Sequence, residues 1–221
     1  MAQNKKVQEE QPEVQVSSFE KFIKKYQKIL TWGVIGILVI VFGILVINRW
    51  VVKPAQEEAR GQMFAAEQAF AAGEYATALN GDGNNLGFAQ IADEYGAKAG
   101  KALWLYAGIS AYNTGDYEAA ASYLKKYNGK DKILKARALC CLGDAYVNLD
   151  KKAAALDCYK KAAALEENIY RATYLLKAGI LCEEMGNEAA ALKYYKEIET
   201  RYPQSIEGYE IQKYISRIEN K

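Results

Sequence analysis

One pattern recurs three times in the second half of the chain and limits the fold more than any other feature. Its centre is a glycine inside an apolar helical pattern, at Gly108, Gly143 and Gly179, which are 35 and 36 residues apart. In each copy a short turn follows, and then a second helical pattern with an alanine and, four positions later, an aromatic residue. A repeat of this length predicts an all-α superhelix in which neighbouring helix pairs bury each other's apolar faces.

The repeated positions resemble those of the tetratricopeptide repeat, whose two helices need small residues where they cross. The matching residues are Trp104, Gly108, Gly115, Tyr117 and Ala120 in the first unit, Leu142, Gly143, Tyr146, Ala155, Tyr159 and Ala162 in the second, and Leu175, Gly179, Gly186, Ala191, Tyr195 and Pro203 in the third. In the second unit Asp150 replaces the turn glycine and Glu167 stands where a proline is usual, so we expect its turns to differ. In the first unit Tyr127 replaces an expected alanine.

A fourth, degenerate unit precedes these three. Residues 59–79 form two helical patterns that turn at Gly73–Tyr75. A Gly- and Asn-rich run, residues 80–87, then interrupts the second pattern and predicts a loop. A plain loop is favoured over a calcium loop because the glycine and the terminal glutamate of a calcium loop do not line up.

The last residues of the chain predict a helix that covers the end of the array. Residues 206–221 place four apolar side chains on one face and charges on the other, namely Ile211, Tyr214, Ile215 and Ile218. A terminal repeat needs such a cover to remain soluble. The soluble domain is therefore expected to span residues 54–221, with about four helix pairs and this capping helix.

The first part of the chain contains an apolar segment, Leu30 to Ile47, of eighteen residues without a charge. A helix of this length spans roughly 27 Å, close to the hydrocarbon thickness of a bilayer. Trp32 and Trp50 lie at its ends, as is typical of membrane interfaces. We predict a transmembrane helix over residues 30–52. The alternative, a buried core helix, would need protein on every side, and no second long apolar segment is present.

The flanks of this segment are polar. Residues 1–16 predict a disordered cytoplasmic tail. Residues 17–29 predict a basic amphipathic juxtamembrane helix, which either lies among lipid headgroups or is simply solvated. Its lysines are Lys21, Lys24, Lys25 and Lys28, against three basic residues after the apolar segment. This small excess favours a cytoplasmic N-terminus and an exported repeat domain, held near the bilayer because the helical pattern resumes by Ala59. No small-residue cleavage site directly follows Ile47, which favours an uncleaved anchor.

Composition excludes several kinds of site. The chain has no histidine, which removes Ser-His-Asp and Cys-His nucleophile systems and His-containing zinc sites. Its four cysteines, Cys140, Cys141, Cys158 and Cys182, are not spaced as CxxC, and we interpret them as buried apolar residues rather than a disulfide or a metal cluster. Residues 54–221 carry 21 Lys or Arg and 23 acids, without a concentrated basic stripe, which argues against nucleic acid. We predict no catalytic residue, metal, cofactor or small-molecule substrate.

The resemblance to the tetratricopeptide repeat implies a concave groove lined by the first helix of each pair. Carrying over the groove positions gives Leu105, Ile109, Tyr112, Cys140, Asp144, Val147, Asn148, Thr173, Leu176, Ile180 and Glu183. Some members of the family clamp a partner's C-terminal carboxylate there, but Leu105, Ile109 and Cys141 stand where that clamp needs polar groups. We therefore expect a groove for extended or helical apolar segments. The alternative is that a neighbouring helix or self-association closes part of this surface.

A short tail, one span and an exported array of about four helix pairs are together similar to the YfgM-like bacterial inner-membrane family. The resemblance implies a single-pass inner-membrane protein whose periplasmic repeat domain serves the secretion translocon and hands emerging chains to periplasmic chaperones. Its partners would be membrane or envelope proteins and the lipid bilayer. Two alternatives remain open, a structural scaffold for envelope assembly and an accessory subunit of an envelope enzyme or transporter.

Overall fold

The computed structural model describes the backbone of residues 18–165 and 170–220, and the side chains of residues 24–165 and 170–220. The expected tail at 1–16, the side chain of Lys21 and the departure at Glu167 lie outside these residues. Helices and turns make up the described chain, in which no strand occurs. The chain divides into two compact units, Met1–Lys53 and Pro54–Lys221.

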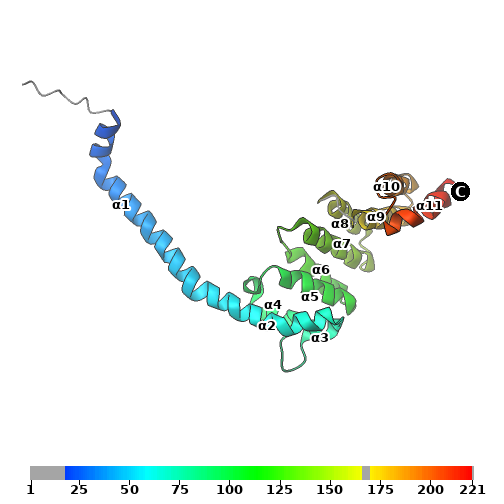
Figure 1. Cartoon of the computed structure of the whole chain (residues 1–221), viewed down its shortest axis with the longest axis horizontal. Coiled ribbons are helices and arrows are strands. Elements are labelled where there is room, and N and C mark those ends of the chain that lie inside the picture. Colours follow the sequence, from blue (N-terminus) through cyan, green and yellow to red (C-terminus); the bar gives the residue numbers. More distant parts are fainter. Residues whose placement is uncertain (1–17, 166–169, 221) are drawn as a thin grey trace, which may run out of the picture. The chain divides into compact units, whose positions relative to one another are not determined.

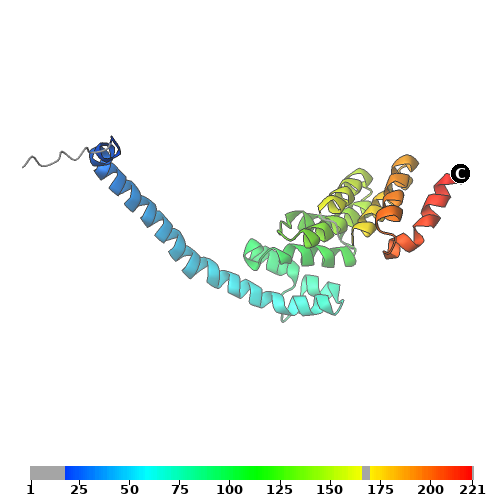
Figure 2. The ribbon, with the colours of Figure 1, turned by 45° about the horizontal axis from the view of Figure 1, so that its top comes forward.

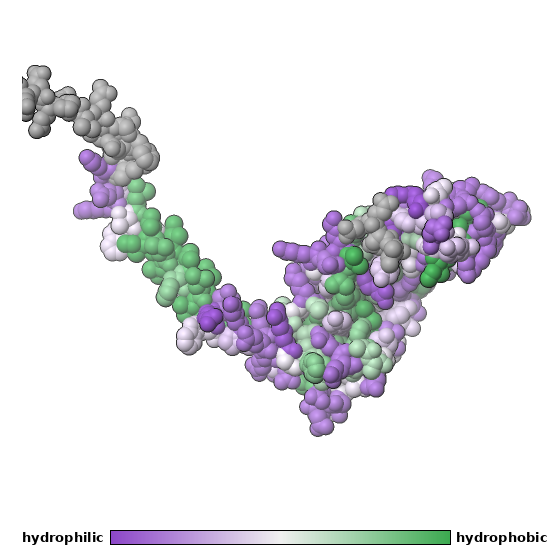
Figure 3. All heavy atoms as spheres, viewed as in Figure 1, coloured by the Kyte–Doolittle hydropathy of each residue, from purple (hydrophilic) through white to green (hydrophobic). Residues whose placement is uncertain are grey.

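The apolar segment forms most of the first helix, α1 (Ser18–Ile47). An 18-residue window of this helix has a mean hydropathy of 2.8 and none of it is buried. Figure 3 shows hydrophobic residues covering its middle. Trp32 and Trp50 are 73% and 78% exposed, and Lys24, Lys25 and Lys28 are exposed as well. By length and composition this helix can cross a membrane, although a signal sequence near an N-terminus has the same properties.

The residues after the apolar segment are helical earlier than the sequence pattern indicated. A π-helical turn (Asn48–Val52) follows α1, and α2 (Lys53–Ala71) begins six residues before Ala59. Pro54 lies just after the π-helical turn, in which the Lys53 amide donates to the carbonyl of Asn48 five residues earlier, so irregular helical hydrogen bonding precedes the residue that lacks an N–H. The polar composition around Pro54 hid the helix from a search for apolar periodicity.

The second unit is a row of helical hairpins. Its helices after α2 are α3 (Tyr75–Asn80), α4 (Phe88–Glu94), α5 (Ala102–Asn113), α6 (Tyr117–Lys126), α7 (Lys132–Asn148), α8 (Lys152–Leu165), α9 (Arg171–Glu184), α10 (Glu188–Arg201) and α11 (Ile206–Glu219), with a 3₁₀ turn at Gly96–Ala99. The pairs α5–α6, α7–α8 and α9–α10 pack as hairpins, and α6–α7 and α8–α9 contacts join them. Figures 1 and 2 both show these hairpins side by side in chain order.

The turn inside each hairpin has one geometry, including the turn that was expected to differ. Its central residue adopts a positive φ in all four units: Gly73 (80°), Gly115 (86°), Asp150 (54°) and Gly186 (77°). The amides of Asp150 and Lys151 donate to the carbonyls of Val147 and Tyr146 at 3.0 and 2.8 Å, and the Gly186 turn makes the equivalent pair at 2.9 and 2.8 Å. The expectation for Asp150 was wrong because aspartate tolerates the left-handed conformation better than most residues.

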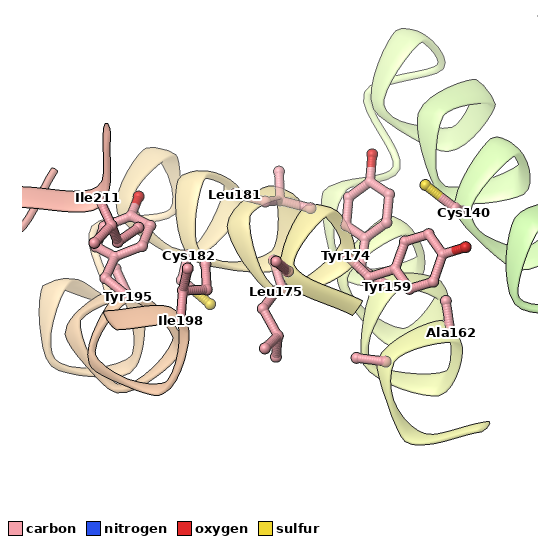
Figure 4. Close-up of a cluster of buried hydrophobic side chains, with 14 of the residues drawn as sticks. Cys140, Tyr159, Ala162, Tyr174, Leu175, Leu181, Cys182, Tyr195, Ile198 and Ile211 are labelled. Carbon is pink, nitrogen blue, oxygen red and sulfur yellow. The ribbon is translucent and has the colours of Figure 1, made fainter. Parts of the chain in front are cut away.

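The core of the second unit consists of three hydrophobic clusters along the array, and the repeated glycines allow its helices to approach closely. A Cβ on Gly143 would lie 2.5 Å from the ring of Tyr159, and one on Gly179 would lie 2.3 Å from the ring of Tyr195. Figure 4 shows the buried side chains running from Cys140 and Tyr159 to Tyr195 and Ile211. All the buried apolar residues described lie between Ala59 and Ile218, so residues 54–221 contain their own core.

The two ends of the array agree with the sequence analysis. At one end α2 and α3 form the degenerate pair, followed by the loop Gly81–Gly87, and their core includes Met63, Phe88 and Leu103. At the other end α11 buries Ile211, Ile215 and Ile218 against the last hairpin, while Tyr214 packs beside them. The capping helix is confirmed.

Candidate protein-binding groove

The predicted groove residues come from the first helices of three hairpins, α5, α7 and α9, and the structure separates them into two sets. Leu105 and Cys140 are each only 5% exposed and belong to the core, and the equivalent Leu176 packs against that core. These three residues occupy one repeat position, 35 and 36 residues apart. This position faces neighbouring helices, so Leu105 and Cys140 offer almost no surface to a partner.

The remaining positions reach the surface. Asp144, Val147 and Ile180 line one hollow of about 130 Å³ between α7 and α9, together with Tyr159, Lys177, Leu181 and Glu184. Asp144 and Thr173 line a neighbouring hollow of about 170 Å³, together with Arg137, Cys141, Tyr170, Tyr174 and Lys177, and the buried Cys140 lies at its wall. Ile109 and Tyr112 are half-buried on α5, and Asn148 is exposed. The structure therefore brings five predicted residues of α7 and α9 around two adjoining hollows.

An ion pair lies where these two hollows meet. Lys177 Nζ donates to both carboxylate oxygens of Asp144, at 2.6 and 2.7 Å, and the hydroxyl of Tyr159 donates to Asp144 Oδ1 at 2.7 Å. The Asp144 side chain is 19% exposed and that of Lys177 is 35% exposed. Burial, followed by the neighbouring Asp144 carboxylate, raises the pKa of Tyr159, which keeps its hydroxyl a neutral donor.

A second bridge of the same kind joins α9, α10 and α11. Tyr195 donates to Glu183 Oε2 at 3.1 Å, and Arg217 Nη2 donates to the same oxygen at 2.7 Å. In both bridges one carboxylate accepts hydrogen bonds from a buried tyrosine and from a cation. The tyrosine lies in the same hairpin as the carboxylate, and the cation lies on the next helix of the array, α9 in the first bridge and α11 in the second. The first hairpin has Leu124 at the position of these tyrosines, facing Gly108, and so has no hydroxyl there.

The bridges determine what the groove presents to a partner. Asp144 and Glu183 are already matched by Lys177 and Arg217, so their charges are internally compensated. The surface beside them is lined by the half-buried Val147 and Ile180, the exposed Asn148 and, at the neighbouring hollow, the exposed Arg137. Asp144 and Glu183 therefore offer little net charge to a charged segment of a partner.

Lys177 is the residue that the sequence reasoning missed, and its position in the sequence was sufficient to find it. It lies four residues after Thr173 and three before Ile180, so all three share one face of α9. The apolar residues that define this face in the repeat pattern do not single out a lysine. Arg137, which lies one repeat before Thr173, was missed for the same reason.

A larger hollow, which no sequence pattern predicted, lies at the end of the array. It has a volume of about 590 Å³ and is lined by Tyr170, Thr173, Arg201, Tyr202, Pro203, Gln204, Ser205, Ile206 and Glu207. Thr173 Oγ1 donates to Glu207 Oε1 at 2.6 Å, which fixes the start of α11 against α9. Thr173 thus borders both this hollow and the smaller one around Lys177.

The four cysteines lie within helices as free thiols. Cys140, Cys158 and Cys182 are buried, as expected for small apolar residues, whereas Cys141 is half-buried. Burial raises the pKa of each thiol, that of Cys140 to about 12. Among the described residues, no group of three or more Cys, Asp or Glu is placed to hold a metal ion.

Replacing Asp144 by asparagine should lower the free energy of unfolding by about 2 kcal/mol, because it leaves the half-buried Lys177 ammonium without its counter-charge. Chemical denaturation of residues 54–221 measures this change. Asp157→Asn is the matched control, since Asp157 pairs with Lys161 on the exposed surface of α8, and it should cost no more than about 0.5 kcal/mol. Equal losses in the free energy of unfolding for the two variants would show that the Asp144 bridge stabilises the fold no more than an exposed ion pair does.

The comparisons with known proteins agree on this architecture. Residues 136–169 match the model of a tetratricopeptide repeat. Two solved structures, entitled "Crystal structure of MamA" and "Crystal structure of MamA protein", are similar in fold. The first has 22% sequence identity and a TM-score of 0.56, with 70% of this chain and 84% of that chain covered. The second has 23% identity and a TM-score of 0.57, with 74% and 84% covered. A comparison with curated protein sequences finds no match.

Proposed function

We propose that the protein is a membrane-tethered protein–protein interaction module of the bacterial envelope, in which the groove of α5, α7 and α9 binds a largely apolar segment of a partner. The observation that carries this proposal is the pair of adjoining hollows along α7 and α9. The groove carboxylates Asp144 and Glu183 are neutralised from within, while Val147 and Ile180 border an open hollow. A repeat array of this fold commonly serves as a binding scaffold.

The tether is α1, crossing the inner membrane once with the N-terminus in the cytoplasm and the repeat domain in the periplasm. The length and hydropathy of α1 support a span, and the lysines before the apolar segment support this direction. In this position the array would act as an ancillary subunit of the secretion translocon or of the periplasmic chaperone network.

Photo-crosslinking in living cells tests the proposal with the full-length protein. A photoreactive residue at Asn148 or Ile180 should crosslink newly exported chains or translocon components. The same residue at Lys160 or Lys193, which are exposed on the second helices α8 and α10, should not. Equal products from both pairs of positions, or products with wall or outer-membrane machinery alone, would contradict the proposal.

A double substitution provides the quantitative test. The double variant Val147→Asp with Ile180→Asp places two charges in the hollow. It should weaken the non-covalent binding of the partner that crosslinking identifies at least about tenfold, since apolar anchors in such hollows dominate binding. Lys160→Asp with Lys193→Asp adds the same carboxylates to the second helices and should leave this binding unchanged.

A further inference from the structure

A basic and apolar surface lies around the connection between α6 and α7 in the second unit. Residues 125–137 hold six Lys or Arg and one acid, in a chain with 29 basic and 27 acidic residues overall. This local excess corrects the expectation that the repeat domain has no concentrated basic region. The excess of Lys and Arg is not visible in the total charge of residues 54–221, because the C-terminal repeats are rich in Asp and Glu.

We call the surface the α7 patch and define it by Lys101, Lys126, Lys130, Lys132, Ile133, Leu134 and Lys135. The ammonium group of Lys101 donates to the carbonyl of Asn128 at 3.1 Å, which brings the start of α5 to this connection. Lys126 lies over the ring of Trp104, with Nζ 4.7 Å from its centroid. Lys130, Lys132 and Lys135 are exposed at the start of α7.

The lysines of the α7 patch lack carboxylate partners. Within the described side chains, none of the five forms a salt bridge. In the C-terminal repeats and the cap, Lys177, Arg171, Lys196 and Arg217 pair with carboxylates, whereas the exposed and scattered Lys151, Lys160 and Lys193 form no salt bridge among the described residues. The acid inside the patch, Asp131, accepts a hydrogen bond from the amide of Leu134 at 2.8 Å and so caps α7. The positive charge of the patch is therefore left for an external anion.

Two apolar side chains stand among these lysines. Ile133 and Leu134 are 43% and 46% exposed in the first turn of α7. An apolar pair flanked by lysines matches the boundary between lipid headgroups and acyl chains, where apolar groups insert and ammonium groups meet phosphates. A nucleic-acid backbone or an acidic protein surface would use the lysines but would gain little from this apolar pair.

We propose that the α7 patch docks on the surface of a membrane that contains anionic lipids. This inference rests on the proposed membrane tether, which would keep the repeat domain near a bilayer. Docking would add a second, peripheral attachment to that of α1. The residues that line the groove hollows differ from those that define the α7 patch.

Cosedimentation of residues 54–221 with lipid vesicles tests the docking. This fragment contains its own core and lacks α1, so the result does not depend on whether α1 spans a membrane. It should sediment with vesicles of phosphatidylcholine mixed with phosphatidylglycerol, and not with phosphatidylcholine alone. Added salt should weaken the binding. Absence of binding to the anionic vesicles would overturn the inference and leave the groove proposal standing, whereas failure of the groove crosslinks would leave vesicle binding unaffected.

Two sets of variants locate the binding. Lys130→Glu, Lys132→Glu and Lys135→Glu together should reduce partition onto anionic vesicles by about a hundredfold, since each lysine near such a surface contributes about fivefold. Lys151→Glu, Lys160→Glu and Lys193→Glu change the net charge equally, on exposed positions elsewhere, and should have little effect. Ile133→Ser with Leu134→Ser keeps every charge and should reduce partition about tenfold. Equal losses in both lysine sets would overturn the inference, as would preferential binding to a nucleic-acid duplex over the vesicles.

Discussion

Replacing Gly179 by alanine is expected to lower the free energy of unfolding of the repeat domain by about 2–3 kcal/mol. The new Cβ would lie 2.3 Å from Cε1 of Tyr195, far inside van der Waals contact. The ring cannot move away cheaply, because Tyr195 is fully buried and its hydroxyl is held by Glu183. Relief therefore requires α9 and α10 to separate, which exposes the core between them.

Chemical denaturation of residues 54–221 measures this loss, and Gly61→Ala is its matched control. Gly61 lies inside α2, and a Cβ added there would meet no atom within 4 Å. The control should therefore gain about 1 kcal/mol from the higher helix propensity of alanine. A similar gain at Gly179 would show that the close approach of the two helices does not stabilise the fold.

The glycines also show why so much of the fold was predictable. A residue type that repeats every 35 or 36 positions reports a contact that recurs in every hairpin, such as Gly143 on Tyr159 and Gly179 on Tyr195. This chain therefore shows the same glycine position three times, once in each hairpin. The same redundancy identified the turns at Gly115 and Gly186, and it misled only where Asp150 adopts the glycine conformation without being glycine.

The groove was less predictable, because exposure at a repeat position depends on neighbouring hairpins. Leu105 and Cys140 occupy a position that family resemblance assigns to the groove, yet packing between successive hairpins buries both. The neighbouring position, with Ile109, Asp144 and Ile180, remains half-buried instead. A spacing pattern places all of these residues on the first helix, and it does not determine which of them the next hairpin covers.

The charge bridges were hidden for a related reason. Asp144 and Lys177 are 33 residues apart and lie in successive hairpins, and Glu183 and Arg217 are 34 apart and lie in the last hairpin and the capping helix. The second bridge also uses a carboxylate one helical turn further along its helix than the first. Repeat alignment compares equivalent positions, and so it does not reveal partners that are offset by two or three residues from the repeat length.

A substitution in the capping helix is expected to have the other large effect on stability. Detachment of this helix from the core should unfold only part of the array. Ile211 is 1% exposed and packs in the cluster that contains Tyr195 and Ile198. Ile211→Asp would bury an unpaired carboxylate there and should cost more than about 4 kcal/mol. The cost is large enough for α11 to detach and leave the last hairpin without its cover.

Hydrogen exchange of residues 54–221 measures where this destabilisation appears. Each hairpin of such an array contacts mainly its neighbours, so Ile211→Asp should remove protection from α10 and α11 first, then from α9, and leave α5 and α6 close to the wild type. Ile206→Asp is the control, because it makes the same replacement in the same helix at a residue that is 83% exposed, where a carboxylate in the first turn is favourable. Loss of protection throughout the array would show that the domain unfolds as a single unit, and that the cap stabilises hairpins it does not touch.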